Sequence, residues 1–239
     1  EQIETIAEQD GFLSVTLTFP EELQSTGLLS SASVIVKVKS EDSNKYEDVS
    51  GTSIFYNPRS TDGRITASSC SLPVRVGDNI ILAIESNQQN TSHDAFGVKV
   101  GWSFISIESD NLVYLGQPTK ITDDVKVKAE TDGFLSLYIN SADYLNTTSE
   151  ASAFCARTAN ELMTSEEMRR DPYKSLETTL VSALTQKASG ANIIDFTKSS
   201  FLLPVPKGNW YTTNINSFSG SHRNDIPYSL LFYPLIPTR

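Results

Sequence analysis

The sequence predicts an all-β protein built from two tandem, related β-sandwich modules of jelly-roll-like type, with a helical insertion in the second. Three observations predict this: apolar and polar residues alternate over short runs, a stretch of twelve residues recurs in nearly the same form, and two further blocks recur in the same order. We expect the first module at residues 1–116, the second at 117–239, and the insertion at about 152–189.

Alternation is the main sign of strands. In the stretch 12–18, Leu13, Val15 and Leu17 fall on one face, and the stretch 33–39 alternates in the same way. Successive side chains of a strand point to opposite sides, so this pattern is typical of a half-buried strand. Polar turns separate the runs, which favours a sandwich or a barrel. Further strands are expected at residues 80–84, 96–107, 111–115, 125–128, 134–139, 210–215 and 228–233.

The repeat opens with "AEQDGFLSVTLT" at residues 7–18, which returns as "AETDGFLSLYIN" at 129–140. Two later pairs of blocks keep the order, and the boundary between the copies falls near Gly116. We interpret the whole as a tandem duplication. The later pairs are "SSCSLPVRVGDNIILAIES" (68–86) with "KSSFLLPVPKGNWYTTNIN" (198–216), and "SHDAFGVKVGWSFISI" (92–107) with "SHRNDIPYSLLFYPLI" (221–236).

The recurring glycines suggest turns. Each Asp-Gly pair is expected to form a tight turn, because glycine tolerates a positive φ without steric cost. The phrases "PVRVGD" and "PVPKGN" are expected to place a proline at a sheet edge or a strand start and a glycine turn before the next strand. Both motifs are interpreted as parts of the scaffold.

One region departs from alternation. Between residues 151 and 187 helix formers predominate, and the pair Asp171-Pro172 is a good helix opening. A second helical segment is expected at 153–168. The offset between the copies rises from 122 to 131 across this region, so we expect an inserted piece here. The residues at helical spacing are Leu176, Leu180, Val181 and Leu184.

Charge argues against a nucleic-acid partner. The net charge of −10 and the pI near 4.7 describe a surface that repels a phosphate backbone, and the sequence contains no basic patch. No apolar run reaches the length needed to cross a bilayer, so no membrane insertion is expected. The chain begins at Glu1 rather than Met, and we expect a leader or a longer N-terminal region to have been removed.

Signatures of catalysis are missing from the sequence. There is no G-x-S-x-G elbow, phosphate-binding loop, H-E-x-x-H or G-x-G-x-x-G motif. The predicted protein is therefore not an enzyme and has no cofactor. Loops 41–44 and 143–146 are rich in oxygen donors, which are the ligands of Ca²⁺, although neither loop has EF-hand spacing. Cys70 and Cys155 form either two buried thiols or a disulfide, and both alternatives stay open.

Two loops and two tryptophans are the candidates for contact with a ligand. The only two histidines fall at corresponding places of the repeat, in the loops 87–94 and 217–225, and loops commonly carry binding residues. Tryptophan can stack on sugar rings while neighbouring polar groups bond to hydroxyls. The candidates are His93, Asp94, His222, Asp225, Trp102 and Trp210.

The repeated phrases resemble the β-sandwich modules of bacteriophage virion proteins of the tail-fibre, receptor-binding and head-fibre types. The similar stretches are residues 7–17, 72–78, 129–139, 203–209 and 230–235, about a fifth of the chain. The closing strand of the pattern contains a proline, as in "YSLLFYPLI" of the second module. The first module departs from the pattern by ending in "WSFISI" without proline. The resemblance implies a non-enzymatic structural or adhesion protein on the virion. It would be homo-oligomeric, bound to other virion proteins, and would bind host-surface glycan if it binds a ligand.

An alternative is a secreted, calcium-dependent, lectin-like carbohydrate-binding protein. "HDAF" at 93–96 and "GFLSLYIN" at 133–140 resemble phrases of small galactose lectins, although a module boundary separates them here. A third hypothesis is a carbohydrate-active enzyme with a cleft formed by the helical insertion. Galactoside calorimetry with and without chelator tests the second hypothesis, and release of reducing sugar tests the third.

Overall fold

A computed structural model describes residues 2–20, 29–39, 44–57, 64–88, 98–107, 113–143, 147–156, 178–188, 194–217 and 226–237. Within these ranges all regular secondary structure is β-strand, so the predicted all-β class is confirmed. The division of the chain at residue 116 stays a prediction. We call β1 to β8 the N-terminal half and β11 to β18 the C-terminal half.

The N-terminal half forms two sheets, with strand orders β1-β7-β3-β4-β5 and β6-β2-β8. All of its strand pairs are antiparallel. The strands are β1 (Gln2–Ile6), β2 (Gly11–Thr18), β3 (Ser30–Lys39), β4 (Glu47–Tyr56), β5 (Arg64–Ile65), β6 (Ala67–Val74), β7 (Asn79–Gln88) and β8 (Lys99–Ser106).

The C-terminal half also forms two sheets, β11-β17-β13-β14-β15 and β10-β18-β12-β16. Two short strands of the connection between the halves, β9 and β10, both pair with β18. The strands are β9 (Val113–Leu115), β10 (Thr119–Lys120), β11 (Val127–Lys128), β12 (Gly133–Asn140), β13 (Thr147–Ala156), β14 (Thr178–Ala188), β15 (Ile194–Phe196), β16 (Lys198–Val205), β17 (Trp210–Ser217) and β18 (Tyr228–Pro237).

The two halves pair their strands in the same order. Adding ten to each strand number of β1-β7-β3-β4-β5 and β6-β2-β8 gives the pairings of the C-terminal half. The register agrees as well: Leu13 lies opposite Phe104, and Leu135, at the same place in β12, lies opposite Phe232. Residues can therefore be matched between the halves strand by strand.

Backbone hydrogen bonds at the turns are matched in the same way. The Ala7 amide donates to the Asp78 carbonyl and the Gly77 amide to the Ala7 carbonyl, both at 2.9 Å. The Ile107 amide donates to the Asp10 carbonyl at 2.9 Å. The matching bonds in the C-terminal half are Ala129 to Asn209, Gly208 to Ala129 and Leu235 to Asp132, at 2.9, 2.8 and 2.7 Å.

Strand β4 is covered on both faces. Its Thr52 hydroxyl bonds to Ser68 of β6 at 2.6 Å, and the neighbouring Ser53 hydroxyl accepts the backbone amide of Lys198 of β16 at 2.9 Å. Neighbouring residues of a strand point to opposite faces, so one face of the β1-β7-β3-β4-β5 sheet meets the N-terminal half and the other meets the C-terminal half. Accordingly, the last eight residues of β4 are all buried, whereas burial alternates along β2.

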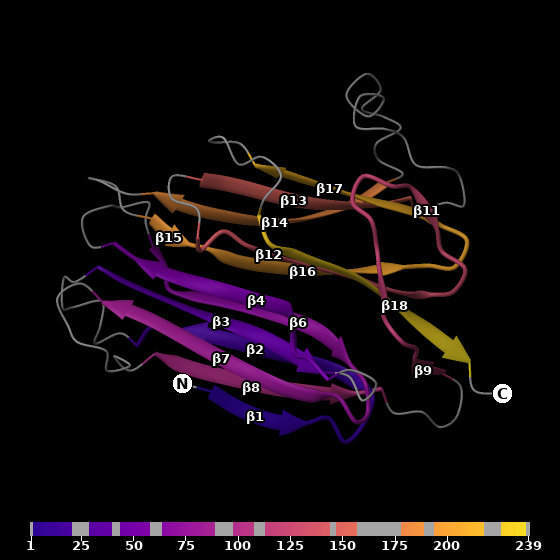
Figure 1. The fold of residues 1–239 in the computed structure, drawn as a ribbon, viewed down its shortest axis with the longest axis horizontal. Coiled ribbons are helices and arrows are strands. Elements are labelled where there is room, and N and C mark those ends of the chain that lie inside the picture. Colours follow the sequence, from indigo (N-terminus) through magenta and orange to yellow (C-terminus); the bar gives the residue numbers. More distant parts are fainter. Residues whose placement is uncertain are drawn as a thin grey trace.

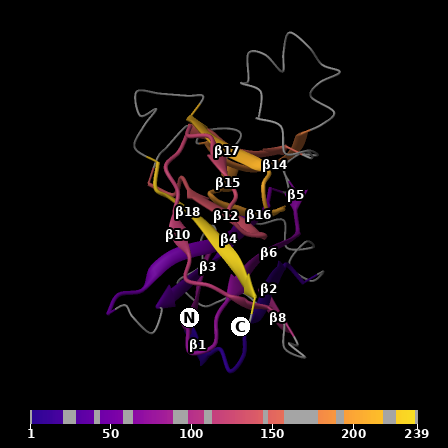
Figure 2. The same cartoon turned by 90° about the vertical axis from the view of Figure 1, so that its right-hand side faces the viewer.

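The cores lie between the paired sheets. The first contains Val15, Val34 and Leu72 of the N-terminal half but also Leu231 and Tyr233 of β18. The second is built from residues of the C-terminal half. Figure 1 shows the strands of the C-terminal half above those of the N-terminal half, and Figure 2 shows β18 descending from one to the other. The halves are therefore joined by a shared core as well as by the chain.

The predicted helical insertion is wrong where the structure describes it. Residues 152–156 belong to β13, and residues 178–188 form β14, which pairs with it. Leu180, Val181 and Leu184 lie in β14, because a ten-residue ladder outweighs a helical spacing of apolar residues. Residues 157–177, with Leu176 and Asp171-Pro172, lie outside the described residues.

The expectation for the Asp-Gly pairs is also wrong. Gly11 and Gly133 have no positive φ, whereas Gly77 and Gly208 do, at 86° and 83°. A Cβ on Gly133 would lie 2.5 Å from the Tyr233 carbonyl oxygen, and one on Gly11 would meet the Ile105 carbonyl oxygen. These glycines are needed for the close approach of a neighbouring strand, and the turns predicted in "PVRVGD" and "PVPKGN" are confirmed.

Candidate functional site

The sequence-predicted contact residues fall into two groups. His93, Asp94, His222 and Asp225 lie outside the described residues. Trp102 and Trp210 are described, on β8 and β17. The structure does not bring them together: Trp102 lies opposite Val15 in the β6-β2-β8 sheet, and Trp210 lies opposite Lys128 in the β11-β17-β13-β14-β15 sheet.

Trp102 lines an apolar cleft at the edge of the N-terminal half. The cleft has a volume of about 380 Å³. Its side chains come from β1 and the turn after it, from β2, from β7 and from β8. We call it the Trp102 cleft, and it is lined by Thr5, Ile6, Ala7, Glu8, Gln9, Leu13, Ile80, Trp102 and Phe104.

The sequence places Trp102 and Phe104 on the core-facing side of β8. They lie opposite Val15 and Leu13, which are buried, and directly opposed residues of an antiparallel pair point to the same face. Nevertheless Trp102 is 55% exposed and Phe104 37% exposed. In the described part of the chain β8 pairs with β2 alone, so these aromatic rings lie at an open edge of the sandwich.

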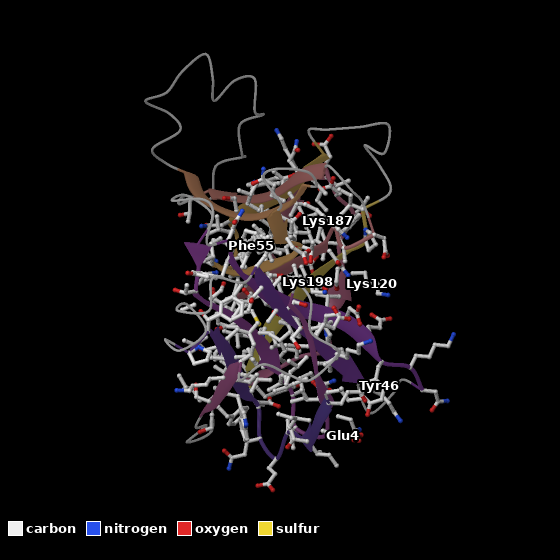
Figure 3. The ribbon with its side chains drawn as sticks, turned by 90° about the vertical axis from the view of Figure 1, so that its left-hand side faces the viewer. Glu4, Tyr46, Phe55, Lys120, Lys187 and Lys198 are labelled. Carbon is white, nitrogen blue, oxygen red and sulfur yellow. The ribbon has the colours of Figure 1, made fainter. Side chains whose placement is uncertain are left out.

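A second, polar cleft lies between the halves. Its volume is about 180 Å³, and Lys198 forms its floor, with a side chain only 3% exposed. The Lys198 ammonium donates to the Glu85 carboxylate at 2.5 Å and to the Ser33 hydroxyl at 2.9 Å. Figure 3 shows Lys198 where the strands of the two halves meet. The pair Ser31 and Asp195 closes the same cleft, with a hydrogen bond of 2.7 Å.

The charges of the polar cleft compensate one another. Burial raises the pKa of Glu85, but the hydrogen bond and the charge of Lys198, the hydrogen bond of Ser33 and the charge of Lys37 together lower it by more, so the net pKa falls below its usual value. A buried ammonium requires an ionised carboxylate as its partner, and Glu85 supplies one to Lys198. Lys187 completes the lining and donates to the Ala142 carbonyl. We interpret this cleft as part of the interface that holds the two halves together.

The cysteine and acidic side chains of the described residues were the candidates for nucleophilic and metal chemistry. Burial raises the pKa of Cys70 to about 11, although a hydrogen bond with Ser50 lowers it, so the thiol stays protonated and is a poor nucleophile. Cys70 is a free thiol, and the Cys155 side chain is outside the described residues. Within the described ranges no group of three or more His, Cys, Asp or Glu side chains could hold a metal ion. The same ranges contain no helix with the length and apolar character needed to cross a membrane.

Sequence reasoning missed several of these residues. Phe104 alternates with Trp102 in "WSFISI", so the period-two pattern could have placed both in one cleft. The link between Lys198 and Glu85 joins residues 113 positions apart, and no local pattern indicates it.

Comparison with known proteins gives no family. No family model matches the chain, and no curated protein matches it. A solved structure found as similar is the N-terminal CBM22-1-CBM22-2 tandem domain from Paenibacillus barcinonensis Xyn10C, at 9% identity and a TM-score of 0.28, covering 100% of this chain and 82% of that one. Another is the infectious bursal disease virus VP2 subviral particle, at 12% and 0.21, covering 97% and 57%. Likeness this low carries no argument about function.

Proposed function

We propose that this chain is a non-enzymatic structural and adhesion component of a bacteriophage virion, built by tandem duplication of one β-sandwich module. The observation that carries the duplication is the matched strand order of the halves. Pairing register and turn hydrogen bonds repeat with it. Such agreement over eight strands is more than a shared preference for antiparallel pairing would give.

The joint between the halves supports a structural role. The Leu115 amide donates to the Asp10 carboxylate at 2.8 Å, and the Arg75 side chain donates to the Leu115 carbonyl at 3.3 Å. Leu115 itself is 1% exposed, inside the first core. Domains joined by a flexible linker move independently, whereas a buried linker residue held by side chains fixes one arrangement. A fixed arrangement of the two halves suits a structural component that holds its neighbours at defined positions in a particle.

Host-surface glycan is the proposed adhesion target. The described residues do not define a glycan-binding site, because four of the six candidate contact residues lie outside them. The proposed partners are other virion proteins and further copies of the chain. The location follows from this: the virion, or the extracellular medium if the secreted lectin alternative holds.

Labelling of particles tests the proposal. Virions of the phage that encodes the chain would be purified, labelled with gold-conjugated antibody against it, and imaged by electron microscopy. We expect label at one symmetric position of the particle and no release of reducing sugar from host polysaccharide. Unlabelled particles would refute the proposal. Chelator-sensitive binding of galactosides in calorimetry would instead support the lectin alternative.

A further inference from the structure

The Trp102 cleft has a counterpart in the C-terminal half. Leu13 and Phe104 are opposed in the register, as are Leu135 and Phe232. On the facing sheet, Thr5 lies opposite Ile80. The matching pair of the C-terminal half is Val127 with Tyr211. Most of the cleft lining can thus be compared, residue by residue, with a site elsewhere in the same chain.

In the C-terminal half this site is covered by a strand. β10 pairs with the free side of β18, with Thr119 opposite Phe232, and the Ile121 amide continues the pairing by donating to the Leu230 carbonyl at 3.1 Å. The Ile121 side chain packs against the second core. In the same core Tyr211 and Phe232 are stacked, with ring centroids 5.3 Å apart. The connection between the halves therefore closes the edge of the C-terminal sandwich.

In the N-terminal half the same position is open. Phe104 is 37% exposed where its counterpart Phe232 is 7% exposed, and Trp102 is 55% exposed. The outer edge of β8 has no partner strand among the described residues. A free strand edge presents unpaired N–H and C=O groups, and apolar side chains beside it add a hydrophobic reward for pairing.

We propose that the edge of β8 and the Trp102 cleft bind an extended peptide strand from a neighbouring subunit of the assembly. The strand pairs antiparallel with β8 and places one aliphatic side chain opposite Trp102, as Ile121 lies opposite Leu230, the counterpart of Trp102, in the other half. This inference rests on the duplication in the proposed function. It names the kind of contact by which the chain joins its neighbours, strand addition at a sheet edge.

The chemistry of the cleft favours a peptide over a sugar. Its lining is mostly apolar, and the groups that need a partner are those of a backbone edge. Glu8 is the acidic group of the rim, so a basic residue beside the aliphatic one suits it. In the covering segment of the C-terminal half, Lys120 precedes Ile121.

A fusion protein tests the proposal directly. A second copy of residues 113–123 is placed before Gln2, the position that the native segment has before Asp124, in a full-length chain carrying Trp210→Phe. Trp102 is then the only tryptophan and reports on its own exposure. The control carries Thr119→Pro and Ile121→Asp within the fused copy, which removes a pairing amide and the aliphatic side chain.

We expect the fused copy to shift Trp102 emission to the blue, to protect it from acrylamide quenching, and to raise Tm by about 3–8 °C over the control. Equal emission and Tm in the two proteins would overturn strand addition. So would a blue shift produced by host glycan and not by the fused strand, which would assign the cleft to carbohydrate.

One further variant separates this inference from the proposed function. Ile121→Ala at its native position should lower Tm, because Ile121 packs on the second core. If it does so while the fused copy has no effect, strand addition fails and the duplication stands. If neither change has an effect, the matching of the two halves fails as well.

Discussion

The carboxylate of Asp10 holds the backbone of Leu115, 105 residues further along the chain, by a hydrogen bond of 2.8 Å from the Leu115 amide. Its other oxygen accepts the Val76 amide, also at 2.8 Å. Asp132, the counterpart of Asp10, accepts the Lys207 amide at 2.7 Å. An aspartate at the same position thus accepts a backbone amide of the same turn in each half. In the first half this residue, Asp10, also binds the backbone of the connection between the halves.

We predict that Asp10→Ala destabilises the protein more than Asp132→Ala. Asp10 loses a turn bond and the bond to the connection, and hydrogen bonds to a charged group contribute more than neutral ones, so we expect a cost of about 2–3 kcal/mol against about 1–1.5 kcal/mol for Asp132. Urea unfolding of the two variants measures the difference. Equal losses would show that the Leu115 bond contributes nothing to the joint.

The glycines of the repeated motif give a second prediction. Gly11→Ala and Gly133→Ala should each cost about 2–3 kcal/mol, because the new Cβ meets a carbonyl oxygen of the neighbouring strand, which cannot rotate away. Gly101→Ala is the control, since a Cβ there meets no atom within 4 Å and the residue is exposed. Its change in unfolding free energy should stay within about 0.5 kcal/mol. If Gly11→Ala matched this control, the close approach would be refuted.

A third prediction concerns the tyrosine between the halves. Tyr138 is 2% exposed, burial raises the pKa of its hydroxyl, and that hydroxyl has no hydrogen-bond partner among the described residues. Tyr138→Phe should therefore be neutral or stabilise by up to about 1 kcal/mol. Tyr138→Ala should cost about 3–5 kcal/mol through the cavity it leaves. Thermal unfolding compares the two, and a large loss in Tyr138→Phe would reveal a partner for the hydroxyl.

The ion pair of the polar cleft predicts a pH dependence. Lys198 lowers the net pKa of Glu85 below its unfolded value, so the pair stabilises the fold above the unfolded pKa, near 4.5, and this contribution is lost as pH falls through the lower folded pKa. Because the Glu85 side chain is 61% exposed, solvent screens the pair, and we expect Glu85→Gln to cost only about 1 kcal/mol at neutral pH.

The measurement is urea unfolding of wild type and Glu85→Gln between pH 7 and pH 3. The difference in unfolding free energy should shrink toward acid. Glu130→Gln, at an exposed residue, controls for the change in net charge. A difference that grows toward acid would contradict the assigned direction of the pKa shift.

Alternation in the sequence predicted β2, and the burial of this strand alternates along most of its length. Alternation did not indicate several other strands, among them β1, β4, β6, β13, β14 and β16. β4 is buried on both faces and carries small polar residues, so its sequence "EDVSGTSIFY" has no period of two. β14 contains apolar residues at a spacing that also fits a helix, and only its pairing with β13 decides the matter.

The site was less accessible to sequence reasoning. Trp102 was identified from its aromatic character, but its exposure depends on an open sheet edge, which is a property of topology. The anchoring role of Asp10 was hidden for a different reason. The "DG" pair suggested a turn glycine, whereas the structure uses the carboxylate as an acceptor and the glycine to let a strand approach.

A crystal structure of the full chain tests the central claim, that the two halves are copies of one sandwich, most directly. We expect residues 11–18, 67–74 and 99–106 to superpose on 133–140, 198–205 and 227–234 within about 2 Å, with Asp10 and Asp132 at the same turn. Placement of Gly11 and Gly133 in unlike sheets, or a different strand order in the two halves, would contradict it.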